Sequence, residues 1–114
     1  MSIPADKLEL YNNLIAAFPK FERKGKTTPY TSLNDHMTSF LDKSGTMGLR
    51  LSAADIESFI NKHDSKLMEQ HGRTMKDFVE IPEGLLEDDK LMLTYLEQSH
   101  SNALSLKPKP SKKK

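Results

Sequence analysis

The chain has 114 residues, of which 36% are hydrophobic and 29% are charged, and it contains neither Cys nor Trp. Folding at this length buries roughly two thirds of the surface of the unfolded chain, which suffices for one core and argues against a two-domain enzyme. The lack of Cys excludes disulfides, thiolate zinc sites, iron–sulfur clusters and cysteine nucleophiles. The sequence has neither an apolar leader at its start nor an apolar stretch of about 18 residues, so we expect a cytoplasmic protein that does not enter a membrane.

The 17 basic and 16 acidic residues nearly cancel, but they are unevenly distributed. Five lysines lie in the last eight positions, which leaves 12 basic and 16 acidic groups in residues 1–106. An acidic folded part is unsuited to duplex DNA or to anionic membranes, which select basic surfaces. The sequence of residues 107–114, KPKPSKKK, has no apolar side chain, so we predict a disordered tail after a domain over 1–106.

The first predicted element is a helix over residues 3–18. Leu8, Tyr11, Leu14, Ile15 and Phe18 recur at spacings of three and four and so share one face. A proline near each end of the segment fits the start and the stop of a helix. Residues 20–28 are rich in basic side chains, and we expect a loop or a lead-in to a sheet there.

Between residues 29 and 51 the apolar period changes to two, which is typical of strands. Turn-forming residues at 34–35 and 43–45 divide the segment into a three-stranded antiparallel meander. Strict alternation places Met37 with Leu41 on one face and Phe40 on the other. In the last strand Met47, Leu49 and Leu51 form the clearest apolar face, and Arg50 projects from the opposite one. We expect Arg50 to pair with an acid across the strands, such as Asp42; the alternative is that its guanidinium binds a carboxylate of a partner or elsewhere in the chain.

Three further elements complete the predicted domain. Ser52 lies three residues before Asp55, as in a helix N-cap, and a short helix follows that ends near His63. Residues 66–70 and 76–81 form a strand pair around a turn at Gly72, with Val79 and Ile81 on one face and Phe78 on the other. A final helix, capped at Asp88 or Asp89, runs to about Leu106 with Met92, Leu96, Ser99 and Ala103 in one stripe.

The resulting order, α-β(3)-α-β(2)-α, predicts an α+β fold of two layers, in which helices cover one face of an antiparallel five-stranded sheet. Links of hairpin length cannot make the crossovers that parallel strands need. The other face of such a sheet stays open, and in small domains an open face often binds a partner or a second copy. We therefore predict a partner surface that includes Arg50, Met37 and Phe40.

No residue pattern predicts catalysis, a cofactor, a small-molecule ligand or a metal. The four histidines form no pair with metal-binding spacing, and the acids at 83 and 87–89 suit a solvated helix start. The serines lack a nucleophile elbow and the glycines lack a phosphate-binding fingerprint. Most of the six methionines are expected to fill the core, with a partner groove as the alternative.

Four segments resemble the N-terminal domain of the TfoX/Sxy family: residues 32–41 (SLNDHMTSFL), 48–51 (GLRL), 72–82 (GRTMKDFVEIP) and 104–110 (LSLKPKP). The resemblance covers about residues 28–110 and implies an antiparallel α-β(3)-α-β(2)-α fold with an interaction surface in place of a catalytic pocket. Two-domain members regulate natural competence in bacteria together with the cyclic-AMP receptor protein. The chain differs in residues 28–32, where many members carry Gly-Gly, and it ends where their second domain begins.

Three functional hypotheses follow. The first is a non-enzymatic module that binds another protein or itself through the open sheet face and regulates transcription indirectly. The second is weak nucleic-acid binding by the tail, helped by a basic segment near residues 20–26; a merely solubilising tail is the simpler alternative. The lysines that would contact phosphate in the tail are Lys107, Lys109, Lys112, Lys113 and Lys114. A small hydrolase or metal enzyme has the least support.

Overall fold

The computed structural model describes residues 3–25, 29–33, 36–70, 72–82 and 84–106. In chain order the elements are α1 (Ala5–Ala16), β1 (Glu22–Lys24), β2 (Tyr30–Leu33), β3 (His36–Leu41), β4 (Met47–Arg50), α2 (Ala53–His63), β5 (Leu67–Gln70), β6 (Arg73–Ile81), the 3-10 helix η1 (Leu85–Glu87) and α3 (Asp89–Ser105). The predicted helices and the meander are confirmed. The predicted tail and the turn at residues 34–35 lie outside the described residues.

The strands form one antiparallel sheet in the order β1-β2-β3-β4-β6-β5. The α+β class is therefore confirmed, but the predicted sheet of five strands is wrong by one. The extra strand, β1, pairs Arg23 with Thr31 and Lys24 with Tyr30 at one edge. Its sequence, Glu-Arg-Lys, has no apolar alternation, so only the backbone pairing with β2 identifies it.

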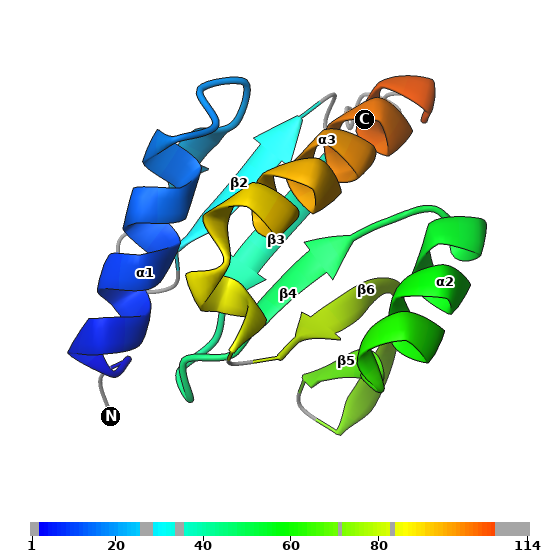
Figure 1. Ribbon diagram of the computed structural model, residues 1–114, viewed down its shortest axis with the longest axis horizontal. Coiled ribbons are helices and arrows are strands. Elements are labelled where there is room, and N and C mark those ends of the chain that lie inside the picture. Colours follow the sequence, from blue (N-terminus) through cyan, green and yellow to red (C-terminus); the bar gives the residue numbers. More distant parts are fainter. Residues whose placement is uncertain (1–2, 26–28, 34–35, 71, 83, 107–114) are drawn as a thin grey trace, which may run out of the picture.

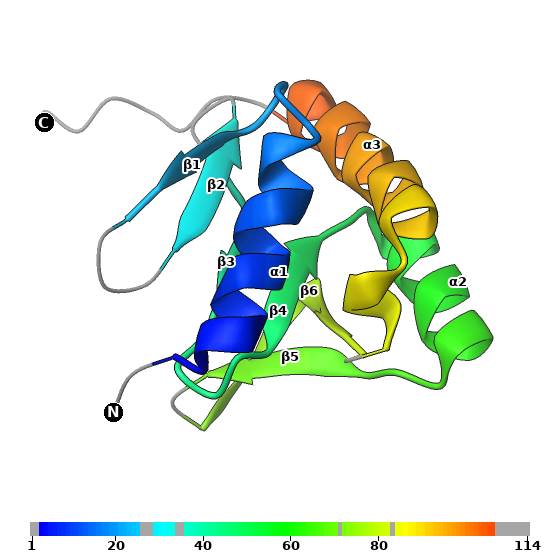
Figure 2. The same ribbon diagram turned by 60° about the vertical axis from the view of Figure 1, so that its left-hand side comes forward.

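The three helices pack on one face of the sheet (Figures 1 and 2). The main core lies between them and the inward side chains of β3, β4 and β6, among them Leu41, Leu49 and Val79, each of which is fully buried. The predicted stripe of α3 faces this core, with Met92, Leu96, Ser99 and Ala103 all buried. We call the opposite side of the sheet the strand face.

Two predicted helix caps are present. The Ser52 hydroxyl accepts a hydrogen bond from the Asp55 backbone N–H at 3.2 Å and starts α2. The Asp88 carboxylate accepts one from the Leu91 N–H, also at 3.2 Å, and starts α3. Each cap satisfies a backbone donor that the first helical turn leaves without a partner.

Candidate interaction surface

The strand face carries a small apolar cluster of its own. Phe40, Met68 and Phe78 are buried at its centre, and three partly buried side chains pack around them: Tyr30, Met37 and Met75. All six come from strands, so among the described residues no helix contributes to this cluster. The expected open face is thus free of described helices, but its centre is already filled by side chains of the sheet.

A β-bulge decides which side chains of β3 belong to this cluster. Thr31 pairs with Ser39 while the next residue, Ser32, pairs with Met37, so Thr38 is an extra residue in β3. The bulge breaks the alternation and places Met37 on the same side as Phe40. The prediction that these two side chains lie on opposite faces is therefore wrong, because it assumed a regular strand.

Close approach of Phe40 to β4 is possible because the position opposite it is Gly48. A Cβ at Gly48 would lie 2.6 Å from Phe40 Cε1 and 3.2 Å from Met68 Cγ. The Phe40 ring also meets the Phe78 ring edge-on, at 5.5 Å between centroids. Phe40 is 4% exposed as a result, so it supports the surface from below and offers almost no contact area to a partner.

Arg50 lies on the strand face, as predicted, beside Met37 and Phe78. Its Nε donates a hydrogen bond to the Met37 carbonyl at 2.7 Å, and its Nη1 lies 3.2 Å from Asp77 Oδ2. The guanidinium carbon is 4.8 Å from the centre of the Phe78 ring, within cation–π range. Arg50 is thus held by three contacts with β3 and β6.

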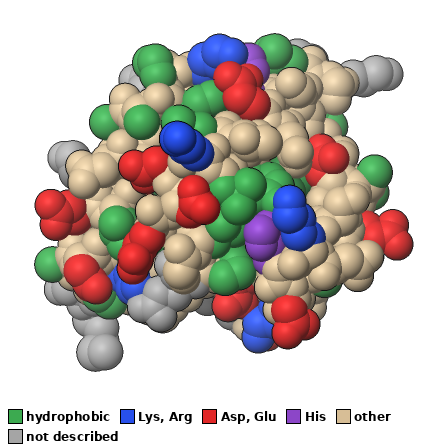
Figure 3. Space-filling view, viewed as in Figure 1, with side chains coloured by type: hydrophobic (Ala, Val, Ile, Leu, Met, Phe, Trp, Pro, Cys, Tyr) green, Lys and Arg blue, Asp and Glu red, His purple; other side chains and the backbone are tan. Residues whose placement is uncertain are grey.

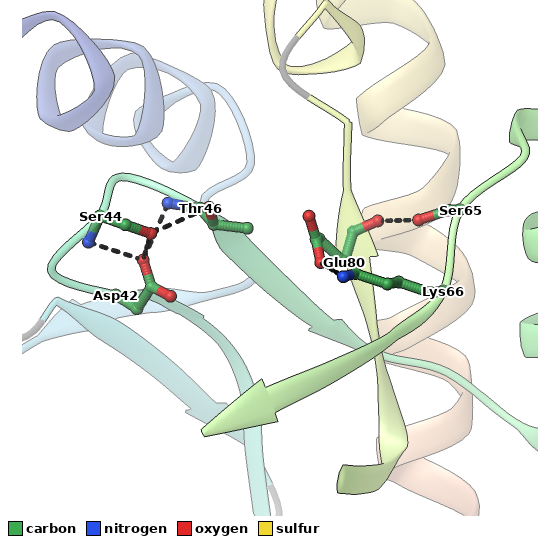
Figure 4. A network of polar contacts seen from close by, with 6 residues as sticks. All are labelled: Asp42, Ser44, Thr46, Ser65, Lys66 and Glu80. Carbon is green, nitrogen blue, oxygen red and sulfur yellow. Dashed lines mark hydrogen bonds and ion pairs between the residues drawn. The ribbon is translucent and has the colours of Figure 1, made fainter. Parts of the chain in front are cut away.

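The prediction that Arg50 pairs with Asp42 is wrong. Asp42 accepts hydrogen bonds from Ser44 and Thr46 inside its own turn, including one from the Ser44 hydroxyl at 2.6 Å (Figure 4). Because Leu41 pairs with Met47, this turn lies beyond the opposite end of β4 from Arg50. Asp77 fits instead because its neighbour Phe78 pairs directly with Arg50.

Two side chains leave positive charge available on the strand face. Arg50 is 16% exposed in its side chain, and its Nη2 donors have no partner among the described residues. Lys24 is exposed and pairs across the strands with Tyr30, so it projects to the same side. A second lysine on this side, Lys66, is 3.9 Å from Glu80 (Figure 4), and Arg73 lies on this side at the end of β6, opposite Gln70.

The basic residues of the nucleic-acid hypothesis are not all available. Lys20 forms an ion pair with Glu97 at 3.0 Å. Arg23 donates hydrogen bonds to Asn12 and to the Gly25 carbonyl. Lys26 and the five tail lysines lie outside the described residues.

The described histidines and acids are dispersed over the molecule. His63 contacts Tyr95, His100 packs beside the rings of Phe18 and Phe21, and Asp88 caps α3. Nowhere in the described ranges do three or more His, Asp or Glu side chains lie close enough to hold a metal ion. His71 and Glu83 fall outside those ranges.

His63 is in a setting that couples its charge to folding. Its Nε2 lies 2.6 Å from the Tyr95 hydroxyl, and its ring lies 4.7 Å from that of Phe59. Burial, and secondarily the charge of Lys62, lowers the pKa of His63 below its usual value of 6.5. The folded protein therefore resists a proton that the unfolded chain accepts.

We expect the free energy of unfolding to decrease as the pH falls below about 6.5, where the unfolded chain binds this proton. The replacement His63→Gln should reduce that decrease. Urea denaturation between about pH 7.5 and pH 5 measures the slope for the wild type and for the variant. Equal slopes for the wild type and His63→Gln would contradict the assignment.

Sequence reasoning missed three contributors to the strand face: Met75, Met68 and Asp77. Met68 and Met75 pair across β5 and β6, at an irregularity in which Leu67 pairs with Val79 and the next residue with Met75. The sequence has no periodic signal that predicts this shift of register. The signal that was available is the excess of methionines in the predicted strands.

Among the described residues, no helix is both long and apolar enough to cross a bilayer. Comparisons of the chain with protein-family models, with curated proteins and with solved structures find no match.

Proposed function

We propose that this chain is a non-enzymatic protein-interaction module that binds its partner through the strand face. The observation that carries the proposal is that Arg50, whose guanidinium is fixed by contacts with β3 and β6, lies beside partly buried methionines. Both are on a sheet face that no described helix covers. Thioether side chains adapt to different apolar shapes, which suits them to contact surfaces. Arginine adds directed hydrogen bonds that fix the orientation of a partner.

The resemblance to the TfoX/Sxy N-terminal domain supports the same proposal. The observed order of elements is the α-β(3)-α-β(2)-α order that the resemblance implies, with β1 added at the edge. By this proposal the chain acts on transcription through a bound protein, in a role related to competence regulation. Its effect on promoters is then indirect and needs no contact with DNA.

The replacement Met37→Glu tests the proposal because Met37 is partly buried at the rim of the strand face. The matched control is Leu104→Glu, on α3, where Leu104 is 58% exposed and is the one exposed large hydrophobic residue in the described ranges. Cross-linking followed by mass spectrometry identifies the partner, which is then purified. Calorimetry measures the affinity of each variant for this partner, and sedimentation measures the self-association of each variant. Met37→Glu should weaken binding at least about tenfold, or roughly 1.4 kcal/mol.

Circular dichroism establishes that both variants fold. Equal affinity of Met37→Glu and the wild type, or a loss confined to Leu104→Glu, would move the binding surface away from the strand face. A shift of labelled DNA by the wild-type chain at about 0.15 M salt would favour the nucleic-acid hypothesis instead.

A further inference from the structure

The charges of the strand face differ from those of the rest of the folded part. Four bases lie on it: Arg50, Lys24, Lys66 and Arg73, the last opposite Gln70 at the end of β6. The acids on it are Glu80, Glu22, which the register places in one row with Ser32 and Met37, and Asp77, which is paired with Arg50. Among the described residues the strand face therefore has four bases and three acids, whereas residues 1–106 together have 12 bases and 16 acids.

The helix side has the opposite character. Acidic side chains are spread over it in Figure 3, and exposed acids lie on all three helices, among them Glu9, Glu57 and Glu97. A two-fold dimer through the strand face would bring two basic surfaces together. Like charges brought together at an interface reduce affinity, so a second copy in that arrangement is a poor fit.

The positions of the basic groups fit an extended chain. Lys24 lies in one row across the strands with Tyr30, Phe40 and Gly48, as the register of β1 to β4 shows. Adjacent strands are about 4.8 Å apart, so Lys24 on β1 and Arg50 on β4 are separated by roughly 14 Å across the sheet. Partly buried Tyr30 and Met37 lie between them on β2 and β3.

We propose that the strand face recognises an extended acidic segment of a partner protein, in which the side chains on one face, at every second position, read carboxylate, apolar, carboxylate. One carboxylate accepts hydrogen bonds from Arg50 Nη2, a second lies near Lys24, and an apolar side chain between them rests on Met37 and Tyr30. This inference depends on the proposed function, because it specifies the partner of the same surface. It predicts a stronger effect of salt than an apolar contact alone would have.

The test uses the full-length chain and an extended peptide of about nine residues, blocked at both ends, with Asp, Leu and Asp at every second position and Ser between them, so that these three side chains share one face. Matched peptides carry Asn or Lys in place of Asp. Amide shifts in heteronuclear NMR spectra locate the site, and titrations give affinities at low salt and at about 0.5 M salt. The Asp peptide should shift amides of β3 and β4 around Met37 and Arg50. It should bind roughly fivefold more tightly than the Asn peptide, and high salt should remove this advantage.

Two substitutions on the strand face and one elsewhere complete the test. Arg50→Gln should weaken the Asp peptide roughly fivefold, and Lys24→Gln by about two- to threefold. Lys90→Gln, at an exposed position near the start of α3, should change nothing. If Arg50→Gln does not fold, Lys24→Gln and the salt series decide, because Lys24 is exposed and has no described partner.

The outcomes separate this inference from the proposed function. Equal binding of the Asn and Asp peptides at the strand face, or tighter binding of the Lys peptide, overturns the acidic partner but keeps the interaction surface. Absence of shifts on the strand face with all three peptides overturns the acidic partner as well. The proposed function itself is contradicted only if Met37→Glu also leaves the affinity for the purified partner unchanged.

Discussion

Replacement of Gly48 by alanine is expected to lower the free energy of unfolding by about 1 to 3 kcal/mol, as overpacking of a filled core does. The new Cβ would lie 2.6 Å from Phe40 Cε1 and 2.9 Å from Phe40 Cζ. The ring cannot move aside easily because it is 4% exposed and packs against Phe78 and Met68. The clash should outweigh the gain of about 0.5 to 1 kcal/mol that alanine normally brings over glycine in a strand.

Gly84→Ala is the matched control. A Cβ at Gly84 would meet nothing within 4 Å, and the residue already has a helical φ of −66°. We therefore expect no loss of stability there, and a gain of a few tenths of a kcal/mol from the stiffer unfolded chain. Urea denaturation measures both variants.

A second substitution examines the cause of the loss at Gly48. Phe40→Leu removes the ring atoms with which the new Cβ clashes, so the double variant should be more stable than the sum of the two single losses predicts. Additive losses would show that the cost at Gly48 does not come from Phe40.

The second large effect is expected at alkaline pH and comes from Tyr11. Its hydroxyl lies 2.8 Å from Ser39 Oγ, which is itself 2.6 Å from Thr31 Oγ1, and Thr31 contacts Thr38 at 2.7 Å. All four side chains are fully buried between α1 and the sheet. Burial raises the pKa of Tyr11 to about 12, although the hydrogen bond with Ser39 opposes the shift.

An unfolded tyrosine loses its proton near pH 10, whereas folded Tyr11 keeps it to about pH 12. The unfolded chain therefore binds fewer protons over this window, and the free energy of unfolding falls as the pH rises. A shift of about two pKa units corresponds to a loss of about 2 to 3 kcal/mol across the window. The replacement Tyr11→Phe should abolish this part of the alkaline decrease, at a cost of about 1 kcal/mol at neutral pH for the lost hydrogen bond.

Denaturation in urea at a series of pH values from about 8 to 12 measures this difference. Ser39→Ala is the comparison, because it disturbs the same network but keeps the phenol, and its alkaline decrease should persist. An alkaline decrease of equal size in the wild type and Tyr11→Phe would assign it to other groups.

The helices were predictable because their signals are local. The spacing of Leu8, Tyr11 and Leu14 identified α1, and the caps at Ser52 and Asp88 marked the starts of α2 and α3. Such signals depend on residues within one or two turns of each other, so no knowledge of the remaining chain is needed. The face of β6 was predictable for the same reason, since alternation places Val79 and Phe78 on opposite sides.

The errors arose where one strand depends on another. β1 has no apolar pattern and is a strand only through its pairing with β2. The bulge at Thr38 exists only in relation to β2, and it alone moves Met37 to the side of Phe40. The choice of Asp77 over Asp42 by Arg50 likewise depends on the register between β4 and β6.

By itself the sequence determined the α+β class, the helix faces and caps, and the side of β4 from which Arg50 projects. Only the tertiary structure decided that Met37, Phe40 and Arg50 lie on the same side of the sheet, that Phe40 is buried beneath its neighbours, and that bases outnumber acids on the strand face of an acidic folded part. The reason is that helical periodicity is a property of contiguous residues. Strand register, bulges and the partners of charged side chains are instead set by contacts between residues that are distant in the chain.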